Sequence, residues 1–193
     1  MDIRAKVVSA ALVFLYIGDV KAADIPAIPV KDEINLINGY SDVQVDDMHL
    51  RIVKGFVGTL NAHSFTTYTT YVLPDKHGGQ WMQVTVPGSR GDEDGLAFMT
   101  IRSAESDSQD IAFYRQNGKL FGVQATRKLT PASAENTAAD IARSNAKPAV
   151  IGLTIFQFNQ DWDVPMFNRR MTVESRGRYI NAGDAISQEI FSH

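Results

Sequence analysis

A β-hairpin is the clearest structural signal in the sequence, and it lies at residues 111–121, which read IAFYRQNGKLF. Asn117 and Gly118 stand in its middle. This dipeptide is typical of the two-residue turn that joins antiparallel strands, because both turn positions need a positive φ angle. Apolar and aromatic residues flank the turn on both sides, so the stretch predicts two adjacent antiparallel strands.

The same rhythm of short strands and turns extends through most of the chain. Alternating or β-branched and aromatic residues predict strands at 43–45, 49–54, 65–73, 81–86, 96–102, 111–114, 150–158, 171–173 and 178–180. One segment departs from this pattern. Alanine and isoleucine recur there at helical spacing after Thr130 and Pro131, which predicts a helix over 131–144 with Thr130 as its N-cap. A final helical turn, capped by Asp184, is predicted through Ile190.

These elements together predict a mainly β fold, an antiparallel β-sandwich or jelly-roll-like arrangement, with one short helix around 131–144. Residues 23–193 form one β-rich domain in this interpretation. Whether the parts on either side of the helix, 30–129 and 148–193, form one sandwich or two subdomains stays open at this level.

The first 22 residues have the pattern of a secretory signal. Arg4 and Lys6 precede an apolar run over 7–17 that is too short to span a bilayer, and Val20 and Ala22 provide modest side chains before a cleavage site. We therefore expect export to the periplasm with cleavage after Ala22. A buried N-terminal helix is the alternative, and it is disfavoured because the apolar run has no polar helical face.

Charge and cysteine usage exclude several classes of function. The chain has 19 basic and 22 acidic residues, for a formal net charge of −3, and the two signs are interspersed. Nucleic acids and anionic membrane surfaces need clustered positive charge, so neither partner is expected, and no membrane insertion is expected either. The absence of cysteine excludes disulfides, thiol chemistry, cysteine-ligated zinc and a cysteine-linked lipid anchor.

Catalytic motifs are missing or misplaced. Ser144 and Lys147 match the Ser-x-x-Lys spacing of penicillin-interacting enzymes, but they fall at the end of the predicted helix, Pro148 follows, and the partner motifs do not occur. The four histidines are scattered rather than spaced as zinc ligands: His49, His63, His77 and His193. No phosphate-binding or dinucleotide-binding motif is present, so no cofactor, no bound metal and no enzymatic activity are predicted.

Acidic residues in two turns leave a cation site open as an alternative. Asp46 and Asp47 form one group, and Asp92, Glu93 and Asp94 form the other. Their spacing lacks the alternate oxygen ligands of known calcium loops, which favours solvated surface charge.

A polar and aromatic run over 61–71, NAHSFTTYTTY, combines hydroxyls, an imidazole and an amide with aromatic rings. Such a mixture suits the wall of a small-molecule site. A β-sheet with one solvated face has the same composition, and the sequence does not decide between the two interpretations.

The same run resembles the signature strand of the CarG-like family of carbapenem intrinsic-resistance proteins. The resemblance continues, in the same order, in the upstream stretch 34–39 and in the closing segments 153–159 and 179–189. It implies a periplasmic self-immunity protein that protects its host by holding a carbapenem without hydrolysing it.

A carbapenem binder needs cationic or hydroxyl donors for the carboxylate and an apolar wall. The candidate ligand-binding residues on this basis are Asn61, His63, Ser64, Thr66, Tyr68, Arg51, Trp81 and Trp162. No residue is assigned a catalytic role.

Two other hypotheses remain. The first is a periplasmic protein-interaction module that docks through strand edges or the Thr/Tyr face, with a homodimer as one form of it. The second is a hydrolase that uses Asp161 and Asp163 on either side of Trp162, although a turn with a tryptophan at its rim explains this tripeptide more simply.

Overall fold

The fold is described from a computed structural model, which covers residues 32–59, 64–73, 79–88, 94–102, 107–129 and 137–191. The predicted signal segment 1–22 lies outside these residues. The elements in chain order are β1 (Asp32–Glu33), β2 (Gly39–Val45), β3 (Met48–Gly58), β4 (Ser64–Leu73), β5 (Met82–Gln83), β6 (Val86–Pro87), β7 (Asp94–Gly95), β8 (Phe98–Arg102), β9 (Asp107–Gln116), β10 (Lys119–Arg127), α1 (Ala138–Asn145), β11 (Ile151–Phe158), β12 (Phe167–Glu174) and α2 (Ala182–Glu189).

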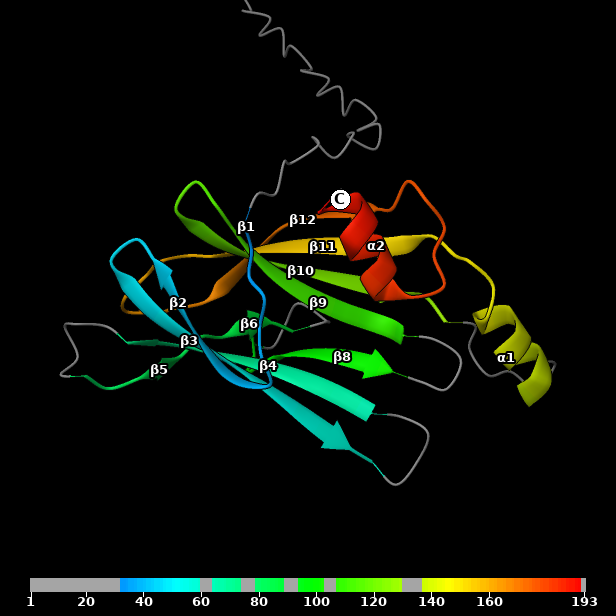
Figure 1. The fold of residues 1–193 in the computed structure, drawn as a ribbon, viewed down its shortest axis with the longest axis horizontal. Coiled ribbons are helices and arrows are strands. Elements are labelled where there is room, and N and C mark those ends of the chain that lie inside the picture. Colours follow the sequence, from blue (N-terminus) through cyan, green and yellow to red (C-terminus); the bar gives the residue numbers. More distant parts are fainter. Residues whose placement is uncertain are drawn as a thin grey trace, which may run out of the picture.

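One open antiparallel sheet organises the molecule, which confirms the prediction of a mainly β fold. Its strands run in the order β12-β11-β10-β9-β8-β4-β3-β2, with β1 paired to β9 and β5 paired to β4. Strands β6 and β7 form a separate two-stranded ribbon. Strand β8 joins the two halves of the sheet, β2–β4 on one side and β9–β12 on the other (Figure 1).

The main hydrophobic core lies between the two halves of the sheet. Strand β3 buries Met48, Leu50 and Ile52 on its inner face, as its alternating sequence predicts. These residues share one cluster with Phe156 and Phe158 of β11. The segments on either side of α1 therefore contribute to one core, and β10 pairs directly with β11.

A second core covers the opposite face of β9–β11. Helix α2 packs there (Figure 1), and it buries Ala182, Ala185, Ile186 and Glu189 at the spacing of one helical face. The sequence predicted only a final turn capped by Asp184, whereas the helix has two turns and its N-cap position is Asn181.

The predicted hairpin is confirmed. Asn117 and Gly118 have φ angles of 50° and 71°, and Gln116 pairs with Lys119 across the turn. A Cβ atom at Gly118 would lie 2.7 Å from Oδ1 of Asp46, so a larger residue there would also displace the Asp46 side chain.

The predicted start of the first helix is wrong. Helix α1 begins at Ala138, because Thr137 is extended and its hydroxyl accepts a hydrogen bond from the backbone N–H of Asp140. The Asp140 side chain accepts in turn from the Thr137 backbone, so the cap is Thr137 and not Thr130. Residues 130–136 lie outside the described part of the chain.

The predicted strand at 171–173 lies within β12, whereas 178–180 does not form a strand. Strand β12 pairs with β11, and Tyr179 forms an isolated bridge with Ala149.

No helix in the described ranges has the length and hydropathy to cross a bilayer.

Candidate functional site

The ligand-binding residues predicted from the sequence occupy separate places. Asn61 and His63 lie outside the described residues. Of the other six, Arg51 lies with Trp81, and Thr66 and Tyr68 share one face of β4. Trp162 lies in a turn that packs against the main core. Ser64 begins β4, opposite Gly58.

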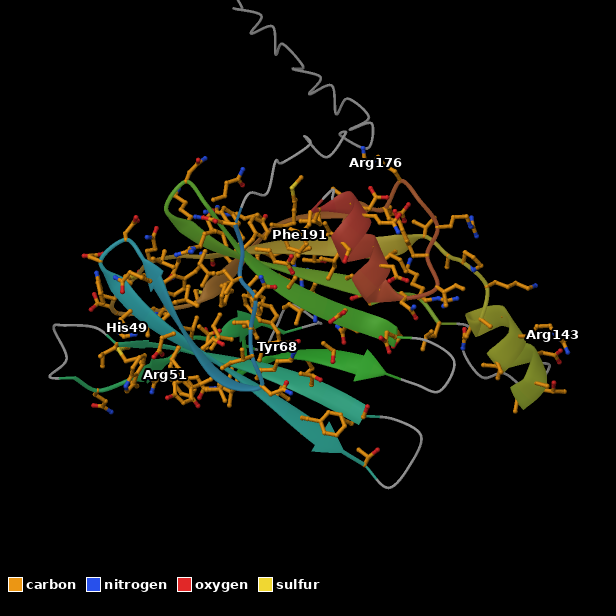
Figure 2. All side chains as sticks on the ribbon, in the orientation of Figure 1. His49, Arg51, Tyr68, Arg143, Arg176 and Phe191 are labelled. Carbon is orange, nitrogen blue, oxygen red and sulfur yellow. The ribbon has the colours of Figure 1, made fainter. Side chains whose placement is uncertain are left out.

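Arg51 is held on the outer face of β2 and β3, where Figure 2 labels it beside His49. Its Nε and Nη2 donate to the two carboxylate oxygens of Asp42 at 2.7 and 2.9 Å. The guanidinium also stacks between two rings, 4.4 Å from the Tyr40 centroid and 4.9 Å from that of Trp81. The hydrogen bond from Arg51 lowers the pKa of Asp42. Arg51 is therefore engaged within the protein, which argues against its predicted role as a donor to a ligand carboxylate.

Thr66 and Tyr68 do share a hollow, on the inner face of β4. Their strand partners on β3 are Phe56 and Lys54, and together they line a space of about 210 Å³. The Lys54 ammonium lies 5.8 Å from the centre of the Tyr68 ring. Lys54 was not among the predicted residues, although the alternation of Leu50, Ile52 and Lys54 places it on this face.

Trp162 packs against the main core from a turn. Oδ1 of Asp161 accepts from the backbone N–H groups of Asp163 and Val164 at 2.9 and 3.3 Å. Asp161 is thus a turn cap, with one carboxylate oxygen engaged by the backbone, which supports the simpler interpretation of this tripeptide as a turn.

The acidic residues do not form a cation site where the structure describes them. Asp46 accepts a hydrogen bond from Gln160 Nε2 at 2.8 Å. Asp92, Glu93 and the side chain of Asp94 lie outside the described residues. Within the described ranges, no group of three histidine or acidic side chains could hold a metal ion.

A larger groove lies across β8, and none of the predicted residues lines it. Its volume is about 470 Å³. We call it the Arg169 groove, and its lining residues are Val86, Pro87, Gly88, Gly95, Ala97, Phe98, Met99, Ile101, Gln109, Gln124, Thr126, Phe156 and Arg169.

Aromatic rings form the apolar part of the Arg169 groove. The rings of Phe98 and Phe156 meet edge to face, with their centroids 5.1 Å apart. The ribbon of β6 and β7 closes one side of the groove. It depends on a close approach at Gly95, where a Cβ atom would lie 3.1 Å from Cγ2 of Val86.

A β-bulge brings Arg169 into the groove. Ile155 pairs with Met171 but Phe156 pairs with Arg169, so Arg170 is an extra residue on β12. In a regular strand Met171 and Arg169 would point to the same face. The bulge reverses this relation, so that Met171 packs in the core under α2 while Arg169 lies beside Phe156.

Arg169 has no acidic partner among the described residues. Its guanidinium carbon lies 6.0 Å from the centre of the Phe156 ring. Gln109, Gln124 and Thr126 add amide and hydroxyl groups to the same lining. This combination of an apolar floor, one cation and a few neutral donors can hold a compact anion with an apolar body.

Comparisons with known proteins find one similar fold. No protein-family model matches the sequence, and no curated protein matches it. Among solved structures, the crystal structure of CarG superimposes with a TM-score of 0.59 at 19% sequence identity, and the match covers 81% of this chain and 94% of CarG. The chain therefore has the CarG fold, as the resemblance of the sequence segments predicted.

Proposed function

We propose that this protein is an exported carbapenem-resistance protein that binds the β-lactam without hydrolysing it. The CarG fold and the resembling sequence segments support the antibiotic class. The observation that carries the proposal is the Arg169 guanidinium, which lies over Phe156 at the edge of an apolar groove and has no acidic partner in the described part of the chain.

The chemistry of a carbapenem matches this groove. The carboxylate of the antibiotic would take a bidentate interaction from Arg169. Its fused rings would lie against Phe98 and Phe156, and the Gln109 and Gln124 amides are available to the lactam carbonyl. The groove volume of about 470 Å³ lies within the range of roughly 300–1,000 Å³ that is usual for small-molecule sites.

The groove lining favours capture over hydrolysis. Opening a lactam requires a nucleophile activated by a general base, or a metal-bound water. The described residues of the lining offer one hydroxyl, that of Thr126, and none of them is histidine, aspartate, glutamate or lysine. Capture is stoichiometric, so protection would scale with the amount of protein in the compartment.

The compartment is part of the proposal. The signal-like segment 1–22 would direct the chain to the periplasm, where the targets of β-lactams lie. Mass spectrometry of the protein from a periplasmic extract should give a chain that begins at Ala23. A full-length chain confined to the cytoplasm would contradict this part.

Expression in a carbapenem-susceptible bacterium tests the whole proposal. We expect the highest carbapenem concentration at which the cells grow to rise with the amount of exported protein, while the antibiotic in the medium stays intact. The absence of protection at high expression would refute the function. Loss of antibiotic far beyond the amount of protein present would replace binding with catalysis.

A protein-interaction module is the second candidate. Strand β2 pairs only with β3 in the described sheet, so one of its edges is open. Tyr40 is 58% exposed on the same strand, over the Arg51 stack. Light scattering after size exclusion would favour this candidate if the protein self-associates and the variant Tyr40→Ser does not.

A further inference from the structure

We propose that Lys54, Phe56, Thr66 and Tyr68 form a second binding site, specific for a small planar carboxylate. This proposal does not rest on the carbapenem function, since none of these four residues lines the Arg169 groove. We call these four residues the Lys54 shelf.

The Lys54 shelf is a continuation of the inner face of the sheet beyond the core. On β3 the inward positions run from Leu50 and Ile52, both fully buried, to Lys54 and Phe56. Phe56 is 71% exposed although it points to the same side as the core residues. An aromatic ring is thus left uncovered next to a cation.

Two hollows adjoin the Lys54 shelf and share two of its residues as lining. One of these is Tyr68, which Figure 2 labels. One hollow, of about 210 Å³, lies toward Asn38 and Phe56. The other, of about 220 Å³, lies beneath the segment that connects β1 to β2. Lys54 and Tyr68 line both hollows, so a ligand centred on Lys54 could extend into either one.

Two polar groups of the shelf, the Lys54 ammonium and the Thr66 hydroxyl, have unused hydrogen-bonding capacity among the described residues. Lys54 forms no ion pair with any described residue. The Thr66 side chain lines the hollow although the residue is only 9% exposed, and its hydroxyl forms no hydrogen bond within the described ranges. Lys54 and Thr66 are diagonal neighbours on paired strands, a separation that a lysine side chain can bridge.

These groups define the ligand class. An ammonium and a hydroxyl beside each other are complementary to the two oxygens of a carboxylate. The exposed ring of Phe56 offers a flat surface, which favours a planar body attached to the carboxylate. Both hollows are smaller than usual drug-sized sites, which favours a small molecule.

Another polar hollow, of about 320 Å³ beside the β9–β10 turn, is a weaker candidate. Its arginine, Arg115, donates to the carbonyl of Gln44, and its Asp46 accepts from Gln160. Arg115 and Asp46 thus already have partners within the protein, whereas Lys54 forms no ion pair with a described residue.

Titration of the purified protein with sodium benzoate, followed by two-dimensional amide NMR, tests the proposal. We expect saturable shifts confined to the amides of residues 54–57, 65–68 and the connecting segment 34–38. Benzamide, which has the same shape without the charge, should bind at least tenfold more weakly because the charged hydrogen bonds are lost. Sodium chloride at equal ionic strength should produce no saturable shift.

Matched variants locate the site. Lys54→Gln should weaken benzoate binding about tenfold, and Phe56→Ala about fivefold. The controls Lys119→Gln, on the exposed β9–β10 turn, and Val57→Ala, on the opposite face of β3, should leave binding unchanged. Unaltered unfolding temperatures would show that each variant is folded.

Three results would overturn the proposal. These are shifts that never saturate, equal binding of benzamide and benzoate, or unchanged benzoate binding in Lys54→Gln. The variant Arg169→Gln separates the two sites, since it should leave benzoate binding intact. If it abolishes that binding instead, the carboxylate occupies the Arg169 groove and the Lys54 shelf is not a site.

Discussion

Arg169 and Phe156 are cross-strand partners at the bulge between β11 and β12, and the guanidinium carbon of the first lies 6.0 Å from the ring centre of the second. The pair joins a cation to an aromatic surface at the edge of the largest groove described above. The proposed binding of a carboxylate with an apolar body depends on this local arrangement.

Replacing Arg169 should weaken carbapenem binding without affecting stability. We expect Arg169→Gln to raise the Kd about tenfold or more, because the bidentate contact with the carboxylate is lost. Calorimetric titration measures the change. Arg143→Gln is the matched control, since Arg143 is an exposed arginine of α1 (Figure 2) that does not line the groove. An equal effect of both variants would show that long-range charge, and not the groove, governs binding.

Phe98 should be a stability determinant as well as part of the groove. Its ring centroid lies 5.7 Å from that of Phe113, 5.1 Å from Phe156 and 5.2 Å from Phe167. We expect Phe98→Ala to lower the free energy of unfolding by about 3–5 kcal/mol through the cavity that it leaves. Urea denaturation measures this loss, and Phe56→Ala, at an exposed ring, should change the same quantity by less than about 0.5 kcal/mol.

Glu189 should make the fold sensitive to acid. Burial alone would raise the pKa of this carboxyl, but Arg176 Nε, the Gly177 N–H and the Tyr179 hydroxyl, each 2.8 Å away, outweigh burial and hold the pKa below its ordinary value of 4.5. A lowered folded-state pKa means that Glu189 stabilises the protein above about pH 4.5 and that this stability is lost as the pH falls through the folded-state value.

The variant Glu189→Gln tests this linkage. At pH 7 we expect it to lower the free energy of unfolding by about 1–3 kcal/mol, because charge-assisted hydrogen bonds become neutral ones. The difference between the variant and the native protein should shrink as the pH falls below 4.5. A difference that stays constant from pH 7 to pH 3 would show that the ionisation of Glu189 does not contribute.

Arg127 should anchor two connections of the chain. It is 4% exposed, and its guanidinium donates to the carbonyls of Lys147, before β11, and Ile180, before α2. We expect Arg127→Met to cost about 2–4 kcal/mol, because the two carbonyls lose their donor. Urea denaturation checks the magnitude, with Arg143→Met as a control expected to be nearly neutral. A neutral effect of Arg127→Met would mean that water replaces the donor at little cost.

Local signals in the sequence account for the parts of the structure that were predicted correctly. The Asn117-Gly118 turn depends on the φ preferences of two adjacent residues, and the common face of Thr66 and Tyr68 depends on the two-residue period of a strand. The two-residue period of β3 also places Lys54 on that face, so Lys54 could have been predicted from the sequence. The N-cap Thr137 could also have been predicted, because Asp140 follows it at capping-box spacing. Thr130 was predicted as the N-cap instead because Pro131 follows it.

The remaining parts depend on register and long-range pairing. Arg51 was expected to be available for a ligand, but the pairing of β2 with β3 sets Asp42 directly opposite it. Arg169 faces the groove only because Arg170 is an extra residue in the β11–β12 ladder. Two adjacent arginines in a sequence do not by themselves indicate a bulge. Trp81 and Trp162 were grouped as walls by composition, yet one stacks on Arg51 and the other packs against the core. A single sequence carries no direct signal for any of these pairings.

Capture without hydrolysis is tested by calorimetric titration of the purified protein with a simple carbapenem, while the absorbance of the lactam ring is followed in the same sample for hours. We expect saturable heat near one antibiotic per protein, a ring absorbance that does not decay, and weaker binding in Arg169→Gln. The absence of heat, or the loss of many lactam rings per protein molecule, would contradict it.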